Sequence, residues 1–94
     1  MRILLKSSFV DRLENQVIYI AKDSPSRARK FNMDVLKEVK NIHPNPYRFR
    51  KSTYFEDNTI RDLIFKGYAI VYKINEETIE VFGFVKYQAK LHDY

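Results

Sequence analysis

Cations interleaved with aromatic rings are the side chains of this sequence best suited to chemistry on an anion. They concentrate between Asn45 and Phe55 (NPYRFRKSTYF), a stretch with three cations, four aromatic rings and no acid. Such rings stack on nucleobases while the cations contact phosphates, and each stacked base contributes about 1–3 kcal/mol. The alternative is structural, with rings that close the open end of a core and cations that are solvated. We expect a mixture, with the rings inward and the cations outward.

Metal-independent cleavage of RNA is the reaction that these cations could support. It needs a base for the 2′-hydroxyl, an acid for the departing 5′-oxygen, and a cation for the phosphorane between them. The acid and the base each contribute about 10²–10⁴-fold, and a planar, always charged guanidinium suits the third task. The candidates are Arg61 for the phosphate, Lys51 or Lys86 as base, and Tyr87 or His92 as acid. No spacing among them assigns the roles.

Arg61 admits two interpretations. It is an exposed arginine at a strand edge, paired with Asp62 or Glu80, or it is a cation on the hollow face of a sheet and contacts an anion.

Composition excludes other kinds of site. Without cysteine the chain has no disulfide, no thiolate zinc site and no cysteine nucleophile. His43 and His92 lie far apart with no carboxylate cluster between them, so no metal site is recognisable and no cofactor is implied. The net charge of +5 favours an anionic partner, such as nucleic acid, an acidic protein or a membrane surface.

The first half of the chain predicts one strand and two helices. Residues 2–6 (RILLK) are a short apolar run typical of a strand. Ser7 or Ser8 is a candidate N-cap for a first amphipathic helix, whose apolar stripe recurs at helical spacing. Ser24 followed by Pro25 predicts the start of a second helix that runs to Ile42. The stripe of the first helix is Phe9, Leu13, Val17 and Ile20.

The second half changes to a period of two and predicts three strands, at residues 60–65, 68–74 and 78–86. Their connections, Lys66-Gly67 and residues 75–77, are so short that the strands must be antiparallel neighbours. The middle strand is apolar on both faces and is expected at the centre of the sheet. The chain is therefore a single domain, residues 1–94, of the α+β class with the order β-α-α-β-β-β.

This order and three segments resemble the RelE/ParE superfamily, the toxins of bacterial type II toxin–antitoxin pairs. The segments are IAKDSPSRARKF at 20–31, IRDLIFKGYAIVYKI at 60–74 and VFGFVKYQ at 81–88. The resemblance implies a helical hairpin packed on a curved, mainly antiparallel four-stranded sheet. It also implies growth inhibition, with a role in plasmid stabilisation.

The resemblance implies two divergent activities. RelE-like members cut messenger RNA in the ribosomal A site, whereas ParE-like members inhibit DNA gyrase and need no nuclease residues. The Ser-Pro joint between the helices favours the ParE branch. Many relatives have arginine where this chain has Ala69, and histidine followed by arginines where it has KYQAK at 86–90. These departures weaken the assignment of a nuclease. A non-toxic nucleic-acid-binding or plasmid-partition module is a third possibility.

The implied partner is an antitoxin with an acidic amphipathic segment that folds along the toxin. Its binding residues are expected among Arg27, Arg29, Lys30, Lys37 and Lys40. Residues that would bind gyrase, or the ribosome and its messenger RNA, are expected among Arg48, Arg50, Lys51, Arg61, Lys66, Lys86 and Lys90. The alternative for each set is a solvated charged face.

We expect a cytoplasmic protein that does not bind membranes. The apolar core of MRILLKSSF is too short for a signal peptide. The free toxin would be a monomer or dimer, and would form a hetero-oligomer with its antitoxin.

Overall fold

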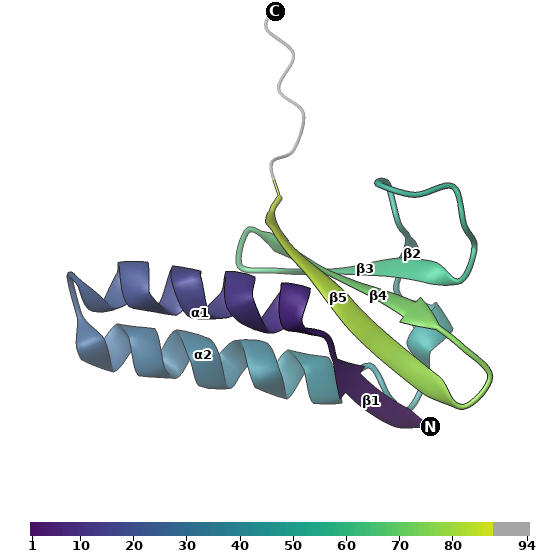
Figure 1. The fold of residues 1–94 in the computed structure, drawn as a ribbon, viewed down its shortest axis with the longest axis horizontal. Helices are drawn as coiled ribbons and strands as arrows, with labels where there is room; N and C mark the ends of the chain where they lie inside the picture. Colours follow the sequence, from purple (N-terminus) through teal and green to yellow (C-terminus); the bar gives the residue numbers. More distant parts are fainter. Residues whose placement is uncertain (88–94) are drawn as a thin grey trace, which may run out of the picture.

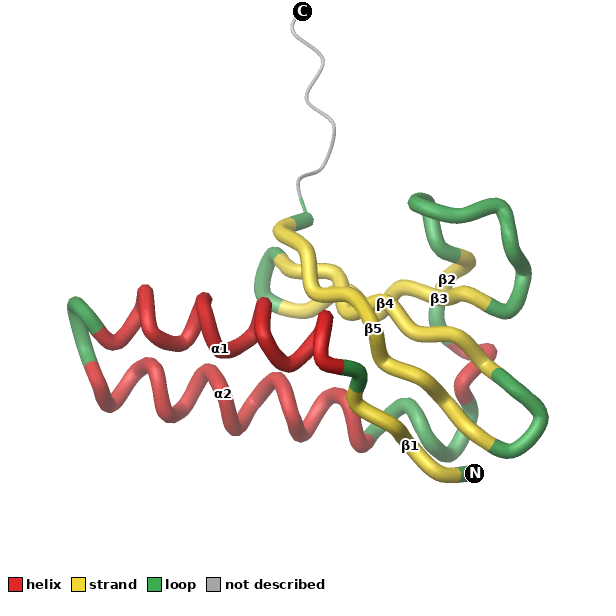
Figure 2. Tube along the Cα trace, viewed as in Figure 1, coloured by secondary structure: helices red, strands yellow, loops and turns green. Residues whose placement is uncertain are grey.

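Two antiparallel helices pack on one face of a five-stranded sheet in the computed structural model, which describes residues 1–87 (Figure 1). The α+β fold and its predicted order are confirmed, and a short strand is added. The elements are β1 Arg2–Leu5, α1 Ser7–Ala21, α2 Pro25–Lys40, a 3₁₀ turn Pro46–Arg48, β2 Arg50–Lys51, β3 Ile60–Phe65, β4 Tyr68–Ile74 and β5 Thr78–Lys86. The loop between the helices lies far from the sheet, and the loop between β2 and β3 projects at the opposite end (Figure 2).

Helix α1 begins without the predicted serine cap. Its N-cap is Lys6, which makes no side-chain cap bond. The backbone carbonyl of Lys6 accepts from the amides of Phe9 and Val10, so the helix starts directly after β1. The hydroxyl of Ser8 instead donates to the carbonyl of Phe82 at 2.6 Å. The serine therefore ties the helix to β5.

Helix α2 begins where the sequence predicts. The Ser24 hydroxyl accepts from the amide of Arg27 at 3.2 Å, and Pro25 occupies the first turn. The helix ends at Lys40, two residues before the predicted end, although Ile42 remains completely buried. Neither helix within residues 1–87 has the length and apolar content needed to cross a bilayer.

The strands are ordered β1-β5-β4-β3-β2. β4 is at the centre, as predicted, and β1 is parallel to β5 while the other pairs are antiparallel. β2 has only two residues, too few for a period-two pattern, and it forms because Arg50 and Lys51 pair with Asp62 and Arg61 of β3.

Two local features of the β3–β4–β5 meander bear on the site. Lys66 and Gly67 both have positive φ, 50° and 82°, as the tight β3–β4 hairpin requires. A bulge in β5 sets Tyr72 opposite Val81 but Val71 opposite Gly83, so that Phe82 is an extra residue. A Cβ atom at position 83 would lie 2.9 Å from the Cβ of Val71, so this close approach requires glycine.

The main core lies between the helices and the sheet. Phe9 of α1 packs edge-on against Phe84 of β5, with ring centroids 5.8 Å apart. Tyr72 of β4 is completely buried, and its hydroxyl donates to the carbonyl of Pro46. This bond fixes the chain after α2 against the sheet. The core consists of Phe9, Leu13, Val35, Val39, Ile42, Leu63, Ile70, Tyr72, Ile74, Ile79, Val81 and Phe84.

Candidate functional site

The face of the sheet away from the helices carries a second, smaller apolar cluster. Ile60, Ala69 and Val71 are its buried members, and they lie on the opposite side of the strands from the main core. Because directly paired residues of antiparallel strands share a face, Arg50 and Asp62 lie on this side with Val71. We call this surface the helix-free face. It includes Arg50, Tyr54, Phe55, Ile60, Asp62, Ile64, Ala69, Val71, Lys73, Phe82, Gly83, Val85 and Tyr87.

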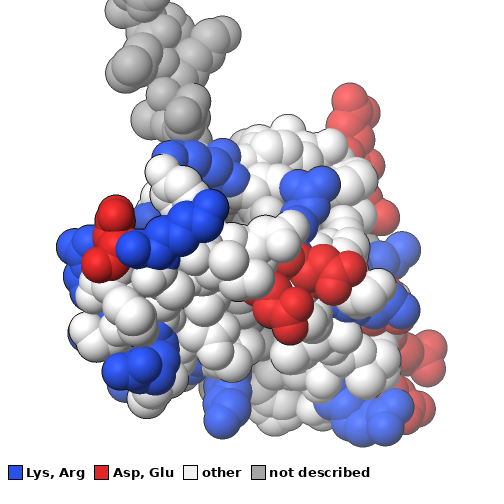
Figure 3. All heavy atoms as spheres, turned by 60° about the vertical axis from the view of Figure 1, so that its left-hand side comes forward, with Lys and Arg blue, Asp and Glu red and all other residues white. Residues whose placement is uncertain are grey.

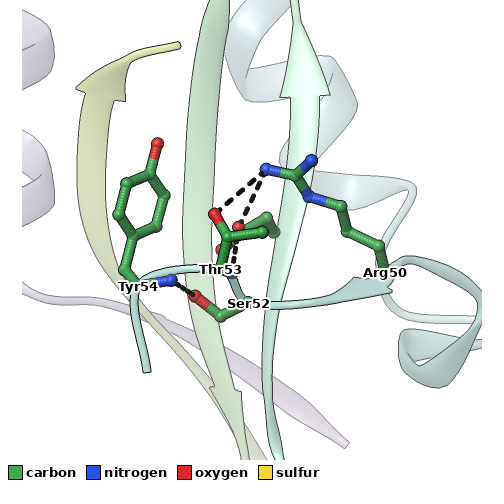
Figure 4. A network of polar contacts seen from close by, with 5 residues as sticks. Arg50, Ser52, Thr53 and Tyr54 are labelled. Atoms are coloured by element: carbon green, nitrogen blue, oxygen red, sulfur yellow. Dashed lines mark hydrogen bonds and ion pairs between the residues drawn. The ribbon is translucent and has the colours of Figure 1, made fainter. Parts of the chain in front are cut away.

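A buried carboxylate organises the β2–β3 side of the helix-free face, where Arg50, Ser52, Thr53 and Tyr54 belong to a network of polar contacts (Figure 4). The side chain of Asp62 is fully buried, and its Oδ2 accepts from the guanidinium of Arg50 at 3.2 Å and from the amide of Thr53 at 3.0 Å. The Ser52 hydroxyl accepts from the amide of Tyr54 at 3.1 Å. These bonds hold the chain that leads out of β2 against β3.

The ion pair neutralises Arg50 within the protein. Its guanidinium carbon also lies 5.0 Å from the ring centroid of Tyr87. Burial disfavours the charge, but the interactions with Tyr87 and Asp62 outweigh it and raise the pKa of Arg50 above its ordinary value. Nε of Arg50 and Oδ1 of Asp62 are buried with no hydrogen-bond partner among residues 1–87. Asp62 and Tyr87 therefore hold Arg50 at the sheet, and Asp62 offsets its charge.

A hollow of about 320 Å³ lies beside this network, over β4 and β5. Its walls are mainly aromatic and aliphatic, with Ser8 and Arg12 from α1 at its edge, and Phe55 and Phe82 are in edge-to-face contact at 5.6 Å. The β5 bulge positions Phe82 here, and Tyr54 and Phe55 are 47% and 45% exposed. The expectation that the rings point inward and the cations outward is wrong for Tyr54 and Phe55, which are exposed, and for Arg50, which pairs with the buried Asp62. It is correct for Phe49, which packs against the main core, and for Lys51, which is exposed. The lining consists of Ser8, Arg12, Tyr54, Phe55, Val71, Phe82, Gly83 and Val85.

Arg61 lies on the helix-facing side of the sheet, opposite Tyr72. Its Nη1 donates to the carbonyls of Tyr47 and Phe49 at 3.1 and 2.9 Å. Its Nε and Nη2 donate to the backbone and side-chain oxygens of Asn58, both at 3.0 Å. The guanidinium also stacks on the ring of Tyr47 at 4.8 Å. Arg61 thus pairs with neither Asp62 nor Glu80 and joins two loops through neutral acceptors.

The other cations expected to bind the target are dispersed. Lys51 is exposed and pairs across strands with Arg61, whereas Lys86 pairs with Tyr68 at the far end of β4. Arg48 donates to the carbonyl of Asn41 at 2.7 Å. Lys66 is in the β3–β4 turn. Two further expected residues, Lys90 and His92, lie outside the described residues.

The residues proposed for RNA cleavage are therefore not brought to one point. Arg61 faces Tyr72 and Lys86 faces Tyr68, four residues away along β4, which is about 13 Å along a strand. Tyr87 contacts Arg50 on the helix-free face, on the other side of the sheet from Arg61. A base and an acid must both be within hydrogen-bond reach of the same substrate. Among the candidates within residues 1–87, only Lys51 and Arg61 are neighbours.

Two residues that shape the site were not among the predicted site residues. Asp62 had a recognisable signal, because alternation along β3 places it in the same row as Ile60 and Ile64. A carboxylate in an apolar row requires a cationic or donor partner. Tyr72 had no such signal, since its partner, the carbonyl of Pro46, is distant in the sequence.

The five cations expected to bind an antitoxin also separate. Arg27 and Lys30 line a hollow with Ile20, Phe31 and Lys66. Lys40 lines another with Ile3, Leu5, Leu36 and Val39, between β1 and α2. Arg29 and Lys37 are exposed on α2 and line neither of these hollows.

Metal-binding chemistry has no candidate in the part of the chain that the structure describes. Residues 1–87 contain no group of three or more His, Asp or Glu side chains able to hold a metal ion.

Comparison with known proteins identifies similar chains. A family model described as "ParE toxin of type II toxin-antitoxin system, parDE" matches residues 3–91. A solved structure titled "Chromosomal ParDE TA system from P. aeruginosa" is similar over 94% of this chain and 97% of that chain, with a TM-score of 0.77 and 14% identity. Curated protein sequences give no match.

Proposed function

We propose that this chain, which belongs to the family of ParE toxins of type II toxin–antitoxin systems, arrests growth by binding and inhibiting DNA gyrase. It is the toxin of a pair, and its partner is an antitoxin. The inhibition is stoichiometric, it takes place in the cytoplasm, and it involves no cleavage of RNA. The contact with gyrase is made by the helix-free face.

The observation that carries the proposal is the set of partners of Arg61. Its Nε, Nη1 and Nη2 donate to oxygens of Tyr47, Phe49 and Asn58. A cation that stabilises a phosphorane must have donors free at the position of the developing charge. Arg61 would have to release these loops to provide them. The arrangement suits a structural arginine better than a catalytic one.

The character of the helix-free face also supports a protein target. Arg50 is neutralised by Asp62, and the neighbouring hollow is walled by Tyr54, Phe55 and Phe82. Nucleic-acid interfaces are much more positively charged than protein interfaces. Exposed aromatic rings around an apolar hollow are typical of the centre of a protein–protein interface.

The test uses two assays, one with purified toxin and one in growing cells. In the first, gyrase supercoils relaxed plasmid with increasing toxin, and we expect loss of supercoiling at micromolar toxin. In the second, the wild-type chain is induced in growing cells and ribosome-bound message is mapped, and we expect no new 5′ ends. Normal supercoiling together with cut message would replace the proposal by a ribosome-dependent endonuclease. No growth defect on induction would point to a non-toxic module.

A further inference from the structure

The hollow on the helix-free face has one charged side chain at its edge. Among residues 1–87, Arg12 of α1 is the only charged residue in the lining, and Ser8 is the only other lining residue that comes from a helix. The rest of the lining comes from the β2–β3 loop, β4 and β5. The hollow is therefore mainly apolar, with a single cation on one side.

Helix α1 is fixed at this place because it follows β1 along the edge of β5. β1 pairs with β5 only as far as Val81, whose carbonyl accepts from the amide of Lys6 at 2.9 Å. The Ser8 hydroxyl then donates to the carbonyl of Phe82 at 2.6 Å, so the first turn of α1 lies beside the middle of β5 (Figure 1). Arg12 follows Ser8 by one turn on the same face of the helix, and this bond therefore places Arg12 at the hollow.

The floor of the hollow is apolar and leaves room for a side chain. Val71 is buried, and Val85 packs with it in the smaller apolar cluster. Gly83, which pairs with Val71, has no side chain to fill the space above the strands. The volume of about 320 Å³ is at the lower end of the range of about 300–1,000 Å³ for ligand pockets. This size suits one or two side chains of a partner.

The aromatic wall is held in position by contacts within the chain. The ring of Phe55 meets Phe82 edge-to-face at 5.6 Å. The loop that carries Phe55 is fastened at its start, where the amide of Thr53 donates to the buried carboxylate of Asp62 at 3.0 Å. A wall that is already ordered loses little conformational entropy when a partner binds.

The guanidinium of Arg12 is available to a partner. Its side chain is exposed, and no ion pair within residues 1–87 includes it. Its polar neighbours one turn away on α1 are Ser8, Asn15 and Gln16, so no acid lies one turn from it on the helix. A guanidinium donates two parallel hydrogen bonds to a carboxylate. Arg12 can therefore pair with an acidic side chain at the edge of the hollow.

The charges around the hollow fit a protein segment better than a nucleic acid. Single strands bind in a groove where several cations follow the backbone. In the described part of the chain Arg12 is the one cation of the lining, and the charge of the nearby Arg50 is offset by Asp62. At the helical end of the molecule, Lys and Arg groups are separated by uncharged atoms and a few acids (Figure 3). That view thus shows no continuous basic groove.

We infer that this hollow takes one apolar side chain of the toxin's protein target, and that Arg12 binds a carboxylate beside that side chain in the target's sequence. The identity of the target as gyrase rests on the proposed function. The chemistry of the bound segment rests on the apolar lining and on charge complementarity with Arg12. Gyrase would therefore present an acidic residue next to an apolar one at the contact.

Charge reversal at Arg12 tests the inference. Arg12→Glu is expected to fold like the wild type, because the position is exposed and glutamate is a good helix former. We expect its Kd for purified gyrase, measured by biolayer interferometry without DNA, to be higher than that of the wild type by about tenfold or more. Arg29→Glu makes the same charge change at an exposed position of α2, outside this hollow. It is the matched control, expected within about threefold of the wild type.

Two further measurements show how Arg12 acts. Salt screens a contact with a carboxylate, so higher ionic strength should weaken the binding of the wild type more than that of Arg12→Gln. Arg12→Glu combined with Phe55→Ala should lose less affinity than the product of the two single losses, because one segment of the target contacts both residues. Equal salt dependence, or strictly multiplicative losses, would overturn the inference. A labelled single-stranded DNA that binds the wild type but not Arg12→Glu would identify a nucleic-acid site and overturn it as well.

Growth arrest on induction separates this inference from the proposed function. If Arg12→Glu inhibits supercoiling as strongly as the wild type does, the inference alone is overturned. If the wild type arrests growth but leaves gyrase active, the gyrase proposal fails. In that case a folded Arg12→Glu that no longer arrests growth would keep the inference for another protein target, whereas an Arg12→Glu that still arrests growth would overturn it too.

Discussion

The guanidinium of Arg50 lies 3.2 Å from the fully buried carboxylate of Asp62, on the face of the sheet that carries no helix. Arg50 is a residue of the basic, aromatic stretch that would otherwise be the first candidate for binding phosphate. The pair turns it into a structural element, because Asp62 also holds the amide of Thr53 at 3.0 Å. A surface expected to be basic is therefore neutral at this point.

Removing one member of this pair is expected to destabilise the fold. Arg50→Ala leaves the Asp62 carboxylate buried and without its cation, at a cost of about 1–3 kcal/mol in the free energy of unfolding, since Arg50 is 35% exposed and the amide of Thr53 still donates to Asp62. Replacing both residues by alanine should cost less than the sum of the two single changes. Urea unfolding of the four proteins measures this coupling. Strictly additive costs would show that the pair does not interact.

Arg61→Ala is expected to lower the stability of the fold, so that any loss of activity follows from that loss of stability. The substitution leaves the carbonyls of Tyr47 and Phe49 without their donor and detaches the loop around Asn58. Only the bond to Phe49 is part-buried and water can replace the others, so we expect a loss of about 1.5–3 kcal/mol in the free energy of unfolding. Lys51→Ala, a neighbouring exposed cation, should change stability by less than about 0.5 kcal/mol. A fully stable Arg61→Ala protein that has lost toxicity would instead favour a catalytic arginine.

Because of Tyr72, the free energy of unfolding is expected to depend on pH in the alkaline range. Burial raises the pKa of its hydroxyl well above the ordinary value, while Arg61 and Arg48 act in the opposite direction. The folded protein therefore keeps the proton after the unfolded chain has lost it. The contribution to stability is complete below the ordinary tyrosine value of 10.0 and decreases as pH rises above it.

The measurement for Tyr72 is urea unfolding between neutral pH and pH 11.5. Tyr72→Phe should lose about 1 kcal/mol near neutral pH, from the bond to the Pro46 carbonyl. Above pH 10 its stability should fall less steeply than that of the wild type. Part of the slope should remain, because burial also raises the pKa of Tyr68. Identical slopes in the two proteins would contradict this assignment.

The exposed ring of Phe55 is expected to matter for gyrase and little for folding. It is 45% exposed and contacts Phe82 at the wall of the hollow on the helix-free face. Aromatic residues at the centre of interfaces commonly contribute 2 kcal/mol or more to binding. We therefore expect Phe55→Ala to need at least tenfold more toxin for half-inhibition of supercoiling. Tyr19→Ala, at an exposed ring of α1, is the control and should inhibit like the wild type.

Local patterns were sufficient for the elements and their order. The stripe of α1, the Ser24-Pro25 start of α2 and the short turn at Lys66-Gly67 each depend on residues within a few positions of one another. Such local patterns can be recognised without knowledge of the rest of the chain. The predictions that rested on them, the α+β class, the central position of β4 and the family, were confirmed. The predicted cap by Ser7 or Ser8 does not form, because the carbonyl of Lys6 accepts from the amides of Phe9 and Val10. The hydroxyl of Ser8 donates instead to the carbonyl of Phe82 in β5.

The sequence by itself thus determined which residues form helices and strands, how these succeed one another, and that the chain is basic. Only the tertiary structure decided which cations are available to a partner. Arg61 is committed to carbonyls 12 and 14 residues away, and Arg50 to a carboxylate 12 residues away. Arg27, Lys30 and Lys66 meet at one hollow although they come from a helix and a distant turn. Strand register and the packing of α2 on the sheet create these contacts. Neither produces a periodic pattern in the sequence from which the contacts could be predicted.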